Sequence, residues 1–182
     1  PALFDALDAE TGQYLFSVDT GFQNLFAAIN PETGEKIPNP NIFPDAEEIR
    51  TVCPYWQGGR NWHASSINNE TGYLFVPMFE VCMDTLLDGS GTLLTSGLRA
   101  DTRPAPDNDG NYGRLQAIDL KNRELAWQHR EEIVPASASL ATAGGLVFLG
   151  YLDSKLKAFD QSNGEILWET QLDAIPAAFP IT

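Results

Sequence analysis

Short apolar runs, separated by clusters of Asp, Asn, Gly and Thr, recur along the whole chain. Two clear examples are residues 73–77, Tyr-Leu-Phe-Val-Pro, and residues 145–150, Gly-Leu-Val-Phe-Leu-Gly, and both have the length of a β-strand. Patterns with the period of a helix are scarce, whereas continuous or alternating apolar runs bounded by turn residues are typical of strands. The chain also contains 15 Gly and 12 Pro residues, which favour turns. The pattern therefore predicts an all-β fold.

One sequence unit occurs several times. Residues 117–127, AIDLKNRELAW, align with residues 158–168, AFDQSNGEILW, at an offset of 158 − 117 = 41. A third copy, residues 6–16, has Phe in the position of the final Trp, and weaker copies begin at Ala28 and Ser66. In each unit we expect Asp or Asn to accept the backbone hydrogen bonds that close a turn, and Gly to supply a positive φ. The returning strand then carries an aromatic residue that packs between sheets.

A period near forty residues, with about four strands in each unit, is the pattern that a propeller blade requires. We predict that residues 1–182 form a single partial β-propeller of roughly three four-stranded antiparallel blades. One complete blade is expected at residues 131–171. Its strands are expected at residues 140–142, 146–151, 155–160 and 166–170.

A second blade, residues 53–130, is predicted to be interrupted. Its early strands are expected near residues 64–78 and its last two strands near residues 113–130. Between them, residues 80–111 are rich in Gly, Asp, Pro and Thr, and we expect an irregular insertion there.

The remaining residues fit the edges of further blades. Residues 1–30 are interpreted as a blade remnant, residues 31–52 as a connecting loop, and residues 172–182 as the first strand of the next blade. Closed propellers usually need about four to eight blades. Either the chain is therefore a segment of a longer protein, or several copies self-associate through open blade faces.

The repeat resembles the blade signature of a known family. The Asp-x-x-x-Gly-x-x-x-Trp turn and residues 142–150, TAGGLVFLG, resemble the blades of the pyrroloquinoline-quinone (PQQ)-dependent alcohol dehydrogenases, which include methanol and quinohaemoprotein alcohol dehydrogenases. Residues 53–62, CPYWQGGRNW, resemble the family's Cys-Pro…Gly-Gly-Lys-Asn-Trp segment, and residues 81–84, VCMD, resemble its Cys-Met-Asp stretch. The resemblance covers nearly the whole chain. It corresponds to the C-terminal half of an eight-bladed catalytic domain.

The resemblance implies a disulfide between Cys53 and Cys82, which lie 82 − 53 = 29 residues apart, as the paired cysteines of the family do. It also implies a periplasmic location, where a disulfide persists. A loop of this size would stabilise the fold by roughly 3–4 kcal/mol in the chain-entropy model. The alternative is that both cysteines are buried free thiols.

The resemblance also implies the cofactor chemistry. PQQ would accept a hydride from the alcohol, with calcium or a lanthanide as Lewis acid, an Asp as general base and a cytochrome as electron acceptor. The base and the metal ligands match no segment of this chain, so they are expected outside it. Within the chain, Asn61 and Trp62 are the candidate cofactor-binding residues. Asn61 could instead be a turn residue and Trp62 part of the core between blades, and Arg60 could meet an anionic group or lie on the surface.

One segment departs from the family pattern. Where the family often has Trp followed by Gly-Gly-Thr near the cofactor, this chain has Ala136, Ser137, Ala138 and Ser139. The corresponding wall of a cofactor pocket is therefore in doubt. His63 and His129 have no second ligand at metal spacing, and we expect both to be structural or exposed. The Asx-rich residues 107–111 fit a surface loop better than a calcium loop.

Charge and hydropathy narrow the partners. The chain has 25 acidic and 11 basic residues, a net charge of −14, which repels nucleic acids and anionic membrane surfaces. No apolar window is long enough to span a membrane. The leading hypothesis is a segment of a PQQ-dependent alcohol dehydrogenase, and we expect the chain alone to be inactive. The alternative is a non-catalytic PQQ-repeat propeller that acts as a protein-binding scaffold, which would have no need of Asn61, Trp62 and the paired cysteines.

Overall fold

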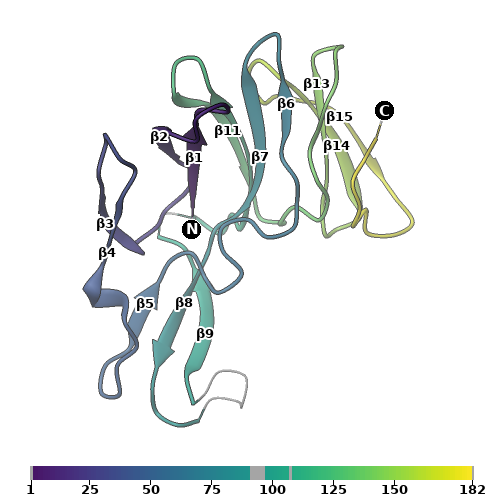
Figure 1. The fold of residues 1–182 in the computed structure, drawn as a ribbon. Helices are drawn as coiled ribbons and strands as arrows, with labels where there is room; N and C mark the ends of the chain where they lie inside the picture. Colours follow the sequence, from purple (N-terminus) through teal and green to yellow (C-terminus); the bar gives the residue numbers. More distant parts are fainter. Residues whose placement is uncertain (1, 91–96, 107, 182) are drawn as a thin grey trace. The chain divides into compact units, whose positions relative to one another are not determined.

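A computed structural model describes residues 2–90, 97–106 and 108–181 (Figure 1). These residues form fifteen β-strands and a single one-turn 3₁₀ helix, η1 (Pro40–Ile42), so the predicted all-β class is confirmed. The strands belong to two compact units, each made of two separate stretches of the chain. We describe each unit by itself.

Unit 2, residues 60–79 and 109–182, contains two four-stranded antiparallel sheets. The strands of the first sheet, in spatial order, are β6 (Ser66–Asn68), β7 (Tyr73–Phe79), β10 (Gly113–Asp119) and β11 (Glu124–Glu131). The strands of the second sheet are β12 (Leu140–Ala141), β13 (Leu146–Gly150), β14 (Lys155–Asp160) and β15 (Ile166–Gln171). Each sheet has the four-strand pattern of a propeller blade.

The strands of the second sheet lie within one residue of the predicted ones, and those of the first sheet fall in the two predicted stretches. The first sheet is interrupted after β7, because residues 80–108 belong to the other unit. The division of all 182 residues into blades around one axis stays a prediction.

The two sheets of unit 2 share an apolar core. Each sheet contributes side chains from the apolar runs that predict its strands, and all of them are 0–8% exposed. They are Phe75, Leu115, Ala117 and Trp127 from the first sheet, Val147, Leu149 and Phe159 from the second, and Tyr151 directly after β13. Because alternate residues of a strand point to opposite faces, these residues place one face of each sheet against the other.

The repeated turn also joins the sheets. Asp160 Oδ1 accepts hydrogen bonds from the backbone N and the hydroxyl of Ser162, which closes the turn between β14 and β15. Gly164 follows with a φ of 76°, and a Cβ there would lie 2.5 Å from Trp127 Cε3. Trp127 therefore lies directly on the glycine, and its indole N–H donates to the carbonyl of Gln161 at 2.8 Å. Glycine is required here by both its φ and the close approach.

The repeated unit differs between the two sheets at two positions. Arg123 stands in the first sheet where Gly164 stands in the second, and it adopts a φ of 62°. Trp168 holds the position of Trp127 in the repeat, yet it is 48% exposed. The aromatic residue of the first sheet is thus buried and that of the second sheet is not.

Unit 1, residues 1–59 and 80–108, contains two hairpins and one three-stranded sheet. The hairpins are formed by β1 (Leu3–Leu7) with β2 (Tyr14–Asp19), and by β3 (Phe26–Ile29) with β4 (Lys36–Pro38). The sheet has the order β5 (Arg50–Val52), β8 (Val81–Leu86) and β9 (Arg99–Pro104).

This unit corrects two expectations. Residues 31–52 were predicted to be a connecting loop, but they contain the strands β4 and β5, which pair with β3 and β8. The insertion at residues 80–111 was predicted to be irregular, but it contributes the two strands β8 and β9. The prediction was wrong because β8 also pairs with β5, in which Arg50 faces Thr85, a partner 35 residues away that local patterns do not reveal.

The chain after β15 returns along its own unit. The backbone N–H of Ala138 donates to the carbonyl of Ala178, and Pro176 lies so close to Gly150 that a Cβ there would be 2.3 Å from the proline ring. The described residues after Gln171 form no strand. A strand is assigned only where it pairs, so the first strand of a further blade stays a prediction.

Candidate cofactor-binding site

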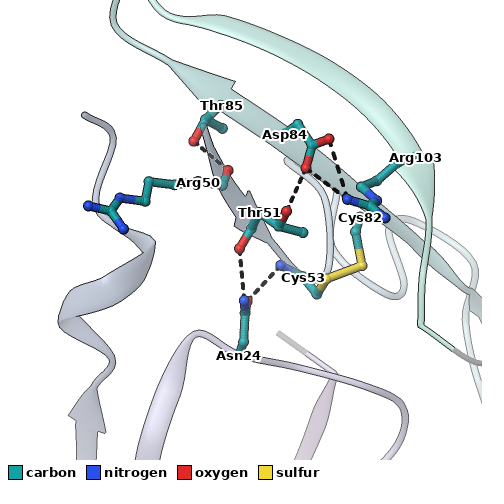
Figure 2. Close-up of polar contacts among 8 residues, drawn as sticks. All are labelled: Asn24, Arg50, Thr51, Cys53, Cys82, Asp84, Thr85 and Arg103. Carbon is teal, nitrogen blue, oxygen red and sulfur yellow. Dashed lines mark hydrogen bonds and ion pairs between the residues drawn. A yellow bond between two sulfur atoms is a disulfide. The ribbon is translucent and has the colours of Figure 1, made fainter. Parts of the chain in front are cut away.

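The structure contains the disulfide between Cys53 and Cys82, in unit 1 (Figure 2). Cys53 follows β5 and Cys82 lies in β8, and both are 0% exposed. Strand pairing brings them together, because Val52 faces Met83 in the β5–β8 ladder. The disulfide therefore fixes the start of the Cys-Pro segment to the sheet that carries Cys82.

Asn24 holds the same segment from the other side. Its side-chain Nδ2 donates to the carbonyl of Thr51 and its Oδ1 accepts from the backbone N of Cys53, both at 2.8 Å (Figure 2). Thr51 Oγ1 donates to Asp84 Oδ1 at 2.6 Å, and Arg103 Nη1 lies 3.4 Å from the same oxygen. These contacts satisfy the polar groups around a buried disulfide and point to structural support rather than to chemistry.

Asn61 and Trp62 lie in unit 2, on the segment that leads to β6. Asn61 is exposed, and Trp62 is 45% exposed. The indole is thus open to a ligand in the described residues, and the alternative that Trp62 belongs to the core between blades stays a prediction. Arg60 Nη1 donates to Ser65 Oγ at 2.6 Å and closes the loop that displays both side chains.

His63, the next residue, supports the Trp62 ring. The two ring centroids are 4.2 Å apart with planes 28° apart, which is a stacked pair. On its other side His63 meets Phe79 edge-on, at 5.0 Å and 89°. His63 is only 5% exposed. Burial, together with the nearby charge of Arg60, lowers the pKa of His63 below its ordinary value of 6.5, so the imidazole is neutral at pH 7.

The returning chain completes this aromatic cluster. Phe179 contacts Trp62 edge-on, with centroids 5.7 Å apart and planes 74° apart. The sequence identified Trp62 but not its partners, because Phe79 and Phe179 lie far away along the chain. In the cluster of Trp62, His63, Phe79 and Phe179, only His63 is buried, whereas Trp62 and Phe179 are 45% and 59% exposed.

The small residues that depart from the family pattern form a buried seam between the sheets. Residues 136–139 are 2–6% exposed. Ser139 Oγ lies 2.9 Å from Ser66 Oγ and donates to the carbonyl of Phe75 at 3.0 Å, and Ser137 Oγ accepts from the backbone N of Gly150. No large side chain from this segment forms a wall for a cofactor.

A hollow of about 550 Å³ in unit 2 fits PQQ poorly. It lies at the end of the sheets that carries the Asp turns, and three of its lining residues are the acids Glu70, Asp119 and Asp160. PQQ carries carboxylates, so these side chains would repel it. Among the described residues no group of three His, Cys, Asp or Glu side chains is placed to hold a metal ion. In the same residues, no helix is long and apolar enough to cross a membrane.

Comparison with known proteins gives the class. The family model described as the β-propeller domain of glucose, ethanol and alcohol dehydrogenases, with PQQ as its short name, matches residues 89–182, more than half of the chain. The chain therefore belongs to this family of quinoprotein dehydrogenase propellers. The matched residues include β9 to β15 but not Asn61 and Trp62.

Individual relatives carry names of the same kind. The chain is 31% identical over 125 residues to the quinoprotein ethanol dehydrogenase of Pseudomonas aeruginosa, which is 68% of this chain and 20% of that protein. It is 37% identical over 134 residues to the 1-butanol dehydrogenase (quinone) of Thauera butanivorans, which is 69% of this chain and 20% of that protein. A europium-containing methanol dehydrogenase structure matches with a TM-score of 0.86 and 24% identity over 99% of this chain and 32% of that one. The chain thus spans about a fifth of these two relatives and a third of the solved structure, which shares its fold.

Proposed function

We propose that this chain is a segment of a PQQ-dependent alcohol dehydrogenase, which in its complete form oxidises an alcohol by hydride transfer to PQQ. The single observation that supports this most is membership of the dehydrogenase propeller family. Relatives named as ethanol and butanol dehydrogenases support a primary alcohol as substrate. When bound, PQQ supplies the carbonyl that accepts the hydride.

The residues near Trp62 suit a planar, anionic quinone. The exposed indole offers a flat surface for stacking, and Asn61 and Arg60 beside it carry N–H donors. Residues 60–65, RNWHAS, contain no carboxylate that would repel the cofactor. In this proposal Trp62 holds one face of the quinone, and Asn61 donates to one of its oxygens.

Other parts of the reaction lie outside this chain in our proposal. The general base, and the ligands of a calcium or lanthanide ion, belong to other blades of the complete protein. A cytochrome takes the electrons in this proposal, since a methanol dehydrogenase and a lupanine 17-hydroxylase among the relatives are named for cytochrome c. The periplasm is the proposed location, and a fully buried disulfide suits that oxidising compartment.

Equilibrium dialysis of PQQ against the 182-residue chain tests this site. We expect weak binding that W62A removes and W56A preserves, because Trp56 is also exposed, at 70%, but belongs to unit 1. Neither variant nor the parent should oxidise alcohols with an artificial dye.

Binding that survives W62A would overturn the assignment of Trp62, and robust oxidation by the chain alone would overturn the placement of the base elsewhere. If no PQQ binds at all, the non-catalytic scaffold becomes the better hypothesis.

A further inference from the structure

We propose that His63 is a positioning residue, which holds the Trp62 indole in the orientation that a planar quinone needs for stacking. The inference rests on the proposed function for the ligand, but its geometric part concerns only residues of this unit. It assigns a role to a histidine for which the sequence predicts nothing beyond a structural or exposed position.

The geometry determines which side of Trp62 a ligand can use. The imidazole covers one face of the indole at 4.2 Å and 28°, whereas Phe179 contacts the indole at a steep angle of 74°. Trp62 nevertheless remains 45% exposed. In this proposal a flat ligand stacks on the face of the indole that the imidazole does not cover, so His63 sets the plane that the ligand meets.

The imidazole is itself held in place. Phe79, the last residue of β7, meets it edge-on at 5.0 Å. The carbonyl of Ala64, the next residue in the chain, accepts from the backbone N of Ser139 at 3.1 Å. Arg60 and Ser65 close the loop on either side through their 2.6 Å hydrogen bond. His63 is only 5% exposed, so between these contacts its ring turns only if the neighbouring residues move.

The chemistry of a neutral imidazole suits this place. Burial and the charge of Arg60 both oppose protonation of His63, so the ring stacks on Trp62 without placing a buried charge beneath it. Trp62 is exposed and, without a supporting ring, would exchange between rotamers. A ligand would then have to order the indole on binding, which weakens its affinity.

Three variants of His63 separate positioning from simple packing. H63L fills the space without a flat ring, and H63F keeps a flat ring without the ring nitrogens. H63Q keeps a polar side chain without a ring. The parent for all of them carries W56F and W168F, so that Trp62 and the buried Trp127 are the remaining indoles. H129Q serves as the control, because it removes the other histidine of the chain.

Acrylamide quenching measures the mobility and access of Trp62, and equilibrium dialysis measures PQQ. For H63L and H63Q we expect faster quenching and PQQ binding weakened about three- to tenfold, the equivalent of losing one aromatic pair. H63F and H129Q should keep both values close to those of the parent. A pH titration of Trp62 fluorescence adds a measurement that a purely packing role would not change. The emission should fall as His63 protonates below pH 6.5, and this step should be absent in H63F.

Each result decides one question. If H63L and H63Q, shown to be folded by circular dichroism, leave quenching and PQQ binding unchanged, His63 does not position Trp62. If H63F behaves like H63L, a flat ring is not what matters and the proposal fails as well. If the parent binds no PQQ, the proposed function fails at this site, while quenching and the pH step still test whether His63 orders the indole.

Discussion

The two sheets of unit 2 carry the same tryptophan in the same place of the same repeat, yet the two side chains differ in environment. Trp127, from the first sheet, is 8% exposed, lies on Gly164 and donates to the carbonyl of Gln161. Trp168, from the second sheet, is 48% exposed. Its neighbours in β15 include Leu167, which is also exposed, at 53%.

Each repeat therefore encodes only half of a contact between sheets. The aromatic residue lies on one sheet, while the glycine and the free carbonyl that receive it lie on the turn of the following sheet. Burial of the tryptophan is therefore decided by the sequence of the next repeat. We therefore expect that the sheet face with the exposed Trp168 can be covered by another sheet of the same kind.

The largest expected effect separates the two tryptophans. W127A removes a buried indole and its hydrogen bond and should destabilise the chain by about 3–5 kcal/mol, the usual range for truncating a buried aromatic residue. W168A should cost less than about 1 kcal/mol, because the side chain is half exposed. Urea denaturation followed by circular dichroism measures both. Equal losses would show that Trp168 is buried in solution and that the two tryptophans do not differ in environment.

Gly164, the residue on which Trp127 lies, has a matched control in Gly12. Gly164 and Gly12 occupy the same place in the repeated turn, with φ of 76° and 71°. A Cβ at Gly164 would meet the Trp127 ring, whereas a Cβ at Gly12 would meet nothing within 4 Å. G12A should therefore cost about 1 kcal/mol, for its backbone alone. G164A should cost clearly more, because it also displaces the indole.

The sequence predicted this second sheet well because its determinants are local. Asp160 and Ser162 form their hydrogen bonds within two residues, and the apolar runs on either side of that turn have strand length. The pairing of Arg50 with Thr85 is not local, and it was missed together with strands β8 and β9. Turns and strands can thus be predicted from a local segment of sequence, whereas the pairing of strands far apart in the chain cannot.

The candidate site shows the same limit. The segment that contains Trp62 stands out because it resembles a family motif, but its environment depends on Phe79 and Phe179, which come from other elements. Phe179 lies 179 − 62 = 117 residues away in the sequence. The sequence therefore identifies Trp62 as a candidate, but only the structure shows how far its indole is exposed and which rings it contacts.

A buried ion pair between the sheets should give the next largest effect. Lys157 of β14 binds Glu131 of β11, with side chains only 7% and 16% exposed, and its ammonium lies 4.6 Å from the centroid of the Tyr151 ring. K157M leaves the carboxylate buried without this partner and should cost about 3 kcal/mol. Denaturation at pH 7 measures this loss.

The same strand supplies the control. Lys155 pairs with Glu169 inside the second sheet, with side chains 36% and 48% exposed, so K155M should cost about 0–1 kcal/mol. The double variant K157M with E131Q should recover part of the loss, because it no longer buries a lone charge. A loss from K155M as large as that from K157M would show that the contact between the sheets is no stronger than a surface pair.

The smallest expected effect concerns the Asp residues of the two turns, where the sheets should behave alike. Hydrogen bonds from Asn122 to Asp119, and from the hydroxyl and amide of Ser162 to Asp160, hold the pKa of each carboxyl below its ordinary value of 3.8. Because the folded pKa is below the unfolded one, each carboxylate stabilises the fold above pH 3.8, and this contribution is lost as the pH falls through the folded pKa. D160N should keep the turn, because an amide oxygen can still accept from Ser162, but should abolish the titration of residue 160.

Carbon-detected NMR titration of the two carboxyl groups provides the measurement. Values below 3.8 at both sites, unchanged in W168A, would show that the turns are local and that the sheets differ only in what covers their tryptophans. A pKa of Asp160 that moves in W168A would show instead that the exposed indole already contacts its own turn.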